Sequence, residues 1–207
     1  MKNRLLIIGA SGHGKVVADI ALKMNTWQSI AFLDDNESVK SSMGIEVIGK
    51  SADAFNYIDD YDFFVGIGNN SIREKIQGKL EAEGASLPIL IHPGAVIGEQ
   101  VELGAGTVVM AGAVINCCTT IGKGCIINTG STIDHDNVIE DYVHISPGAH
   151  LAGTVKVGRG TWLGIGSVVS NNLNISGGCE FGAGAVVVKD ITEPATYVGV
   201  PVRKIGR

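Results

Sequence analysis

The stretch INCCTTIGKGCIINTGSTI, from Ile115 to Ile133, decides the fold of this chain. An isoleucine recurs in it at every sixth position, and apolar residues continue this spacing without a gap from Ile91 to Val187. A helix would place apolar residues three and four positions apart, and a flat sheet would not turn every six residues. The pattern therefore predicts short strands joined by tight corners. The apolar anchors are Ile91, Ile97, Leu103, Val109, Ile115, Ile121, Ile127, Ile133, Ile139, Ile145, Leu151, Val157, Leu163, Val169, Ile175, Phe181 and Val187.

Small or β-branched residues stand two positions before most anchors, as at Thr107, Ser131 and Ala149, and only Asn137 and Leu173 loosen this rule. Glycine often follows the anchor, where a tight corner demands unusual backbone angles. If three hexads form one triangular coil, residues eighteen apart stack, and the anchors fill a continuous interior ladder. The array then makes about five coils of a left-handed parallel β-helix.

The composition agrees with this fold and excludes several classes of protein. Aromatic residues make up 5% of the 207 residues, whereas glycine contributes 29, which favours strands and turns over a helix bundle. The formal net charge of −5 argues against nucleic-acid binding, which needs a concentrated basic surface. No segment is apolar for long enough to span a bilayer, and the apolar run Leu5–Ile8 is better explained as a buried strand than as a signal peptide. We therefore expect a cytoplasmic protein with no membrane partner.

Before the repeats, the chain alternates strand and helix signals, which predicts a small α/β, Rossmann-like module. We expect it to occupy residues 1–86 and the β-helix to occupy residues 87–207 with its C-terminal tail. Gly84 is a plausible end for the last helix of the module. The expected strands are Arg4–Ile8, Ile30–Leu33 and Phe63–Ile67, and the expected helices are Lys15–Lys23 and Ser71–Glu83.

Two glycine-rich loops follow strands of this module. If the strands are parallel, both loops lie at the same edge of the sheet, where open α/β sheets bind ligands and a helix N-terminus can face a phosphate. The first loop departs from the dinucleotide fingerprint, so a simple strand-to-helix turn remains an alternative. With two nearby carboxylates, a nucleotide pocket is the better interpretation. The candidate residues are Gly12, His13, Gly14, Lys15, Asp34, Asp35, Gly66, Gly68 and Asn69.

The repeat array resembles the hexapeptide-repeat acyltransferases, and the whole chain is similar to the sialic acid O-acetyltransferase family, which joins a Gly-x-Ser-Gly-His-Gly-Lys module to such repeats. Within that family it most resembles the N-acetyltransferases of UDP-4-amino-4,6-dideoxy sugars. The resemblance implies a homotrimer whose sites lie between subunits, with acetyl-CoA as co-substrate. It also implies that the first module holds the UDP-sugar, with His13 near the diphosphate or sugar.

Acyl transfer from a thioester needs a base for the attacking amine and a donor for the oxyanion. His135 lies two residues past an anchor, so it should project outward from a corner beside the carboxylates of Asp134 and Asp136. The resemblance makes His135 the general base and Asp136 its orienting acid. Gly153, eighteen residues after His135, would stack on the base and offer its N–H to the oxyanion. An ordinary solvated corner histidine is the alternative for His135.

The resemblance also assigns the remaining contacts. Asn128 matches a position that contacts the sugar, and the remaining matches face coenzyme A. His144 should point outward near the thioester, whereas a basic tail such as Arg203-Lys204 is as often merely solvated. The residues expected to contact coenzyme A are His144, Gly153, Ile165, Ala183, Arg203 and Lys204.

No metal is expected. A β-helix zinc site needs three converging imidazoles, but His144 and His150 are six residues apart and lie on diverging faces. The four cysteines lack paired zinc-site spacing, and Cys117 and Cys118 are adjacent, so we interpret them as reduced, structural thiols.

The sequence thus predicts an acetyl-CoA-dependent N-acetyltransferase of the 4-amino group of a UDP-linked sugar, serving bacterial glycan biosynthesis. Two alternatives are open: O-acetylation of a sialic acid or another sugar hydroxyl, and a non-catalytic nucleotide-sugar-binding scaffold.

Overall fold

The computed structural model describes residues 2–206 and divides the chain into two compact units, with the division between Pro93 and Gly94. The sequence placed a boundary between residues 86 and 87. The division found in the structure leaves β6 (Leu90–Ile91), the strand at the first anchor, in the first unit. Within the described residues, no helix combines the length and apolar character needed to cross a membrane.

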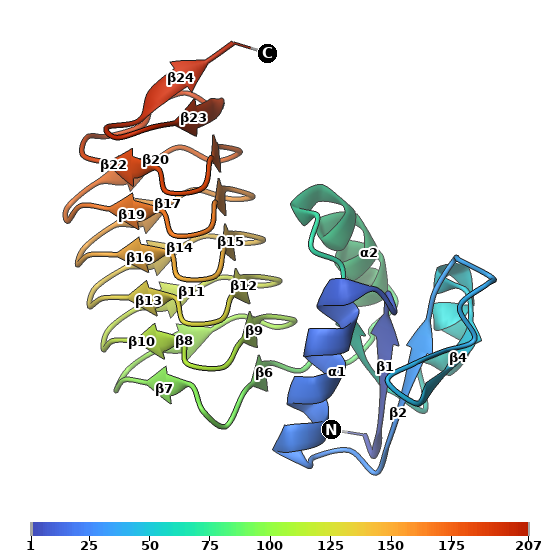
Figure 1. Cartoon of the computed structure of the whole chain (residues 1–207). Coiled ribbons are helices and arrows are strands. Elements are labelled where there is room, and N and C mark those ends of the chain that lie inside the picture. Colours follow the sequence, from blue (N-terminus) through green and yellow to red (C-terminus); the bar gives the residue numbers. More distant parts are fainter. Residues whose placement is uncertain (1, 207) are drawn as a thin grey trace. The chain divides into compact units, whose positions relative to one another are not determined.

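The first unit is a five-stranded sheet in the order β3-β4-β2-β1-β5, with strand β1 at the point where the strand order reverses. Figure 1 shows β1 and β2 of this sheet beside helix α1. All neighbours pair in parallel except β3 with β4. Leu6, Ile8, Leu33 and Phe63 form part of its core. The elements are β1 (Arg4–Ile8), α1 (Gly12–Met24), β2 (Ser29–Leu33), β3 (Ser41–Ser42), β4 (Ile45–Gly49), the 3-10 helix η1 (Ser51–Tyr57), β5 (Asp62–Val65) and α2 (Asn70–Ala82).

Two of these elements begin or end at residues other than those predicted from the sequence. Helix α1 begins at Gly12 rather than Lys15, because its first turn packs on the end of β1: a Cβ at Gly14 would lie 1.9 Å from the Gly9 carbonyl oxygen. The glycines that discouraged a helix are therefore what allows it to start there. Strand β5 ends at Val65 rather than Ile67, because Gly66 already packs against Gly14.

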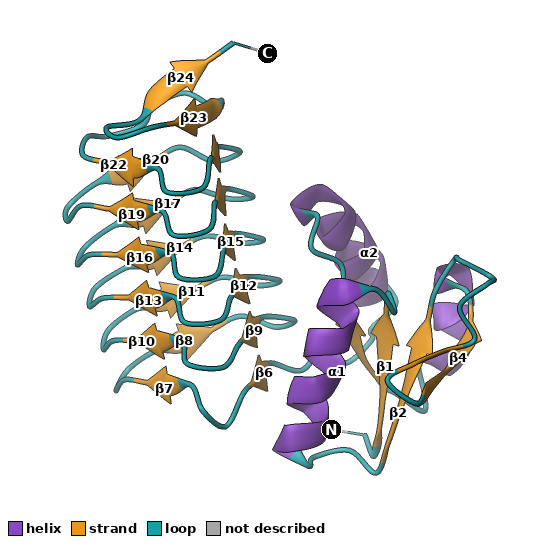
Figure 2. Ribbon diagram, viewed as in Figure 1, coloured by secondary structure: helices purple, strands orange, loops and turns teal. Residues whose placement is uncertain are grey.

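The second unit is the left-handed parallel β-helix that the hexads predicted, with short strands on three faces of each coil (Figure 2). Strands eighteen residues apart pair in parallel, as Ile115 does with Ile133. The strands are β7 (Val96–Ile97), β8 (Glu102–Leu103), β9 (Val108–Val109), β10 (Val114–Ile115), β11 (Thr120–Ile121), β12 (Ile126–Ile127), β13 (Thr132–Ile133), β14 (Val138–Ile139), β15 (His144–Ile145), β16 (His150–Leu151), β17 (Lys156–Val157), β18 (Trp162–Leu163), β19 (Val168–Val169), β20 (Asn174–Ile175), β21 (Glu180–Phe181), β22 (Val186–Val187), β23 (Thr196–Val198) and β24 (Arg203–Ile205).

The anchors from Val109 to Val187 are buried and stack along the axis of the helix. Burial of each such aliphatic side chain contributes roughly 1.5–3 kcal/mol, which accounts for a stable coil despite strands of only two residues. Asn137, which departs from the small-residue rule, is also fully buried. Its amide donates to the carbonyl oxygens of Asp134 and Ala152, and its Oδ1 accepts from the N–H of Val155.

The three corners of the coil differ in the residue at the left-handed position. One corner uses glycine in every coil from Gly112 to Gly184, and a second uses glycine except at Tyr142. The third corner has no glycine there, although each non-glycine residue in this conformation costs roughly 1–2 kcal/mol. We call it the side-chain corner. It comprises Glu99-Gln100, Cys117-Cys118, His135-Asp136, Gly153-Thr154 and Asn171-Asn172, with positive φ at Gln100, Cys118, Asp136, Thr154 and Asn172.

All four cysteines are free thiols, as predicted, but they are of two kinds. Cys125 and Cys179 are buried, which fits a structural role. Cys117 and Cys118 are exposed at the side-chain corner, so the interpretation as structural thiols is wrong for this pair.

Candidate active site

His135 is displayed at the side-chain corner just after β13, with 53% of its side chain exposed. Its Nδ1 lies 2.7 Å from Oδ2 of Asp136. Because a carboxylate only accepts, Nδ1 carries the proton, and Nε2 of the neutral ring keeps its lone pair for a substrate. Sequence reasoning placed His135 outward beside an orienting acid, and the structure has both features.

Charges around the ring raise the pKa of His135 above its ordinary value. The hydrogen bond that His135 donates to Asp136 is the largest cause, followed by the charge of Asp134. Asp134 is itself held by Asn116, whose amide donates to Oδ1 over 2.8 Å, and by the N–H of His135. Asn116 was not predicted, although its spacing of eighteen residues from Asp134 was available in the sequence. The cluster therefore stabilises an imidazolium, as a general base requires once it has taken a proton.

Gly153 stacks on His135, as the register predicted. A Cβ built on Gly153 would lie 2.6 Å from Cε1 and 2.7 Å from Nε2 of His135, so only glycine leaves room for the ring. Gly153 is buried, and its N–H has no hydrogen-bond partner among residues 2–206. An available N–H next to Nε2 is what an oxyanion donor needs.

His144 lies on β15, and β14 separates it from His135 in the chain. It is buried rather than open to solvent, because Trp162 of the next coil stacks on its ring at 5.3 Å. Its Nε2 lies 3.1 Å from the amide nitrogen of Asn128, so these two predicted residues are in contact. Trp162 in turn donates to Oγ of Ser146. The sequence did not single out Trp162, although it stands eighteen residues after His144.

The predicted glycine loops of the first unit follow β1 and β5, whose parallel pairing brings both to the carboxyl edge of the sheet. Gly12 and Gly68 face open space, whereas Gly14 and Gly66 pack against each other and against Gly9. The last two glycines therefore hold the loops together, and the first two leave backbone room for a ligand. Helix α1 has no side-chain cap and no acidic residue in its first turn, which leaves an N-terminus suited to a phosphate.

His13 stands at this N-terminus, and its Nε2 is buried with no hydrogen-bond partner in the described part of the chain. Desolvation and the nearby charge of Arg73 lower the pKa of His13 to about 4, so the ring is neutral near pH 7. Arg73 is buried and donates to the carbonyl oxygens of Ile67 and Gly68. It lies within a helix with no motif around it, and sequence reasoning missed it.

The other predicted nucleotide contacts have structural partners. Oδ2 of Asp34 accepts from the N–H of Ala10, and Oδ1 of Asp35 accepts from Ser51. Asn69 caps α2 by accepting from Ile72, and Lys15 is exposed on α1. A cavity of about 440 Å³ lies beside Asp34 and is lined also by Asn36, Lys40, Lys50 and Asp53.

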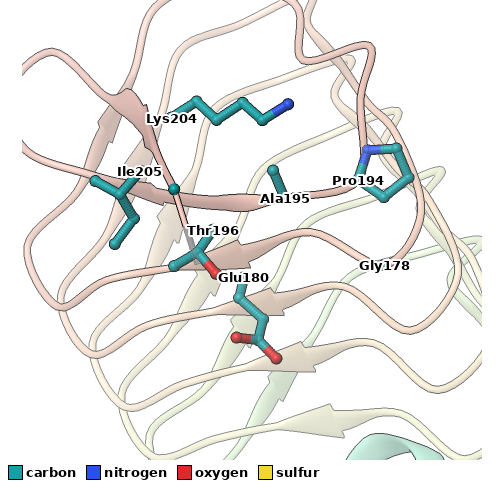
Figure 3. A pocket seen from close by; sticks show the side chains of 8 residues that line it. Gly178, Glu180, Pro194, Ala195, Thr196, Lys204 and Ile205 are labelled. Atoms are coloured by element: carbon teal, nitrogen blue, oxygen red, sulfur yellow. The ribbon is translucent and has the colours of Figure 1, made fainter.

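The residues expected to contact coenzyme A lie in later coils. Ile165 and Ala183 are exposed and stack at one glycine corner, where the N–H of Gly184 donates to the carbonyl of Ile165. Lys204 lines a cavity of about 410 Å³ with Glu180, Thr196 and Ile205 (Figure 3). Its Nζ is 2.7 Å from Oε2 of Glu193, whereas Arg203 is exposed. Among residues 2–206, no three His, Cys, Asp or Glu side chains converge as a metal site would require.

Comparison with solved structures identifies the protein family. The acetyltransferase domain of PglB from Neisseria gonorrhoeae FA1090 is 40% identical, covers 99% of this chain and 100% of that chain, and superposes with a TM-score of 0.96. The chain belongs to the hexapeptide-repeat acetyltransferase family. Within that family, the chain is similar to amino-sugar N-acetyltransferases, as the sequence predicted.

The names of further relatives state the substrates of those proteins. The same Neisseria domain has been solved in complex with acetyl coenzyme A. Perosamine N-acetyltransferase from Caulobacter crescentus, a histidine-to-asparagine variant bound to CoA and GDP-perosamine, is 35% identical over 98% of this chain and 97% of that chain, with a TM-score of 0.94. Residues 4–80 match the PglD N-terminal domain. The UDP-N-acetylbacillosamine N-acetyltransferase of Bacillus subtilis is 36% identical over 54% of this chain, which spans 52% of that protein.

Proposed function

We propose that this protein transfers the acetyl group of acetyl-CoA to the 4-amino group of a nucleotide-linked 4-amino-4,6-dideoxy sugar, with UDP as the nucleotide. The observation that carries this proposal is the His135 group: an exposed imidazole, held by Asp136 at 2.7 Å, beside the available N–H of Gly153. Two relatives cover nearly the full chain, an acetyltransferase domain solved with acetyl coenzyme A and a perosamine N-acetyltransferase solved with CoA and GDP-perosamine. They support the donor and the reaction.

The proposed chemistry follows from these groups. The 4-amino nitrogen attacks the thioester carbonyl carbon while Nε2 of His135 takes a proton from it. The carbonyl oxygen becomes an oxyanion and accepts from the N–H of Gly153. When the tetrahedral intermediate collapses, the carbon–sulfur bond breaks, and the imidazolium returns its proton to the departing thiolate. The products are the N-acetyl sugar and free coenzyme A.

The first unit supplies the features that suit the nucleotide. Gly12 and Gly68 leave backbone room, and the N-terminus of α1 can receive the diphosphate. His13 is neutral near pH 7 and has an available ring nitrogen. The cavity beside Asp34 has the polar lining that a base and ribose need. These features support a nucleotide-linked acceptor over a free sugar.

Coenzyme A is proposed to run along the later coils, past His144, Ile165 and Ala183, toward Arg203 and Lys204. Ile165 and Ala183 offer an exposed apolar column for the pantetheine chain. Lys204 would exchange its surface pair with Glu193 for a phosphate, at little cost because exposed ion pairs contribute only about 0–1 kcal/mol. We also propose a cytoplasmic homotrimer that completes its sites between subunits. Light scattering on the purified protein gives the subunit number directly.

The nucleotide has one competing candidate. The relative bound to GDP-perosamine indicates that a guanine nucleotide also fits this family. The experiment is a panel of UDP- and GDP-linked 4-amino-4,6-dideoxy sugars, CMP-sialic acid and free sialic acid, assayed for thiol release from acetyl-CoA. We expect the highest kcat/KM with a UDP-linked amino sugar. A preference for sialic acid would show that the protein is an O-acetyltransferase. An absence of thiol release with every acceptor would favour a non-catalytic binding scaffold.

A further inference from the structure

The pair of residues one coil before His135-Asp136 at the side-chain corner is Cys117-Cys118. The register is fixed by the backbone, since the N–H of Asp136 donates to the carbonyl oxygen of Cys117 over 3.2 Å. Both thiols are exposed, and Cys118 has φ +60°. Glycine, Asn and Asp are the usual residues in that conformation, so a cysteine there is unusual.

The proposed contacts of coenzyme A lie on one side of His135 along the axis of the β-helix. Gly153, the proposed oxyanion donor, lies one coil after His135, and the proposed coenzyme A contacts Ile165 and Ala183 lie in later coils still. Cys117 lies one coil before His135, about 4.8 Å away along the axis. With the thioester on the later side, the acceptor has the earlier side, where the next displayed side chains are those of Cys117 and Cys118.

We propose that Cys117 and Cys118 form the acceptor side of the active site and contact the sugar ring, so that their size determines which substituents the acceptor carries next to its amine. This inference rests on the proposed function and names two specificity-determining residues within it. Thiols are small and weakly polar, and they suit the C–H face and the methyl group of a 6-deoxy sugar better than an added hydroxyl.

The two thiols have distinct positions. Cys118 points back toward the coil before it, where its Sγ lies 3.5 Å from Oε1 of Gln100. Loss of hydration and the adjacent Cys117 raise the pKa of the Cys118 thiol, which keeps it protonated near neutral pH. Cys117 stands in the same column as His135 and Gly153, so it is the residue of the pair that we expect to meet the sugar more closely.

Alkylation tests the contact directly. Cys125 and Cys179 are buried, so N-ethylmaleimide added to the native protein should modify the corner pair, and Cys118→Ser leaves Cys117 as the single exposed thiol. A nucleotide-linked amino sugar at ten times its Kd should slow modification of Cys117 about tenfold. Coenzyme A alone should change the rate of Cys117 modification by less than about twofold. Protection by coenzyme A alone, or none by the acceptor, would overturn the inference.

A pair of substitutions tests the specificity. Cys117→Phe should raise the KM for the amino sugar roughly tenfold or more while the KM for acetyl-CoA stays unchanged. Val138→Phe, at an exposed position on β14, is the matched control and should leave both KM values unchanged. An unchanged acceptor KM in a folded Cys117→Phe protein would contradict the assignment.

The outcomes separate this inference from the proposed function. If the wild-type protein acetylates a nucleotide amino sugar but the acceptor leaves Cys117 unprotected, the inference fails and the function stands. If the protein transfers no acetyl group to any amino sugar, the proposed function fails and takes this inference with it.

Discussion

The imidazole of His135 lies directly over the α-carbon of Gly153 in the next coil, where a Cβ would come within 2.6 Å of Cε1. Gly153 has no positive φ, so Gly153→Ala changes the packing without straining the backbone. We expect it to displace His135 and lower kcat by about 10²-fold or more, since misplacing a base by about 1 Å costs that much. Steady-state kinetics give the loss.

The control for this substitution is Gly78→Ala in α2, where a Cβ meets nothing within 4 Å. That variant should keep full activity. Wild-type kcat in Gly153→Ala would show that the base is not held in the position described.

Asp136 is the largest cause of the raised pKa of His135. Because the base must be neutral, kcat/KM should fall as the pH drops through this pKa. Asp136→Asn removes the charge while asparagine still tolerates φ +57°. The pKa of His135 should therefore fall, the acidic limb of the pH–rate profile should move to lower pH, and the plateau should drop by less than the roughly 10²–10⁴-fold that a general base supplies.

Asp134→Asn is the matched comparison, since Asp134 acts on His135 as the smaller, second cause. The acidic limb of the pH–rate profile of Asp134→Asn should also move to lower pH, but by less than that of Asp136→Asn. If the acidic limbs of the pH–rate profiles of the wild type and Asp136→Asn coincide, Asp136 does not orient His135.

Asn137 holds the strand ends around His135 from inside the coil. Asn137→Ala leaves the buried N–H of Val155 without its side-chain acceptor, which costs about 1–3 kcal/mol of unfolding free energy. We also expect lower kcat at temperatures where the protein stays folded, because Asp134 and Ala152 lose the amide that joins their coils. Thermal denaturation and kinetics on one preparation measure both effects.

Thr161→Val provides the comparison for Asn137→Ala. It removes a buried hydroxyl that donates to Ser176 at a different corner. It should lower stability and leave kcat intact. Equal losses of kcat in both variants would mean that Asn137 acts through general stability alone.

His13 titrates at about pH 4 in the folded protein and near its ordinary 6.5 when unfolded. The unfolded chain therefore binds a proton first as the pH falls, and the stability contributed by neutral His13 is complete above pH 6.5 and is lost between pH 6.5 and 4. His13→Gln should flatten the fall in unfolding free energy over that range. Urea titrations at the two ends of the range give this difference, and parallel curves for both proteins would contradict it.

The β-helix could be predicted in detail because its signal is local and repeated. Each hexad carries its own anchor, so an error at one position such as Asn137 does not move the others. The same period placed Gly153 over His135 and would also have found the pairs Asn116–Asp134 and His144–Trp162. The first unit has no such redundancy. Strands β3 and β4 went unnoticed, and α1 was started too late because glycine is a poor helix former in isolation.

The contact between His135 and Asp136 was predictable, because chemistry and spacing coincide there. Arg73 was not, because a buried arginine within a helix has no sequence signal until the loop that it supports is seen. The special character of the side-chain corner was hidden for a related reason. Only the backbone angles show that Cys118, Asp136 and Thr154 share a conformation that the other corners give mostly to glycine.

The central claim is that His135 transfers the proton in acetylation of a nucleotide-linked amino sugar. The most direct measurement is mass spectrometry of a UDP-linked 4-amino-4,6-dideoxy sugar incubated with acetyl-CoA and either wild-type protein or His135→Ala. The wild type should add one acetyl group to the 4-amino nitrogen, and His135→Ala should do so about 10²–10⁴-fold more slowly while binding both substrates normally. Acetylation by His135→Ala at the wild-type rate would contradict the claim.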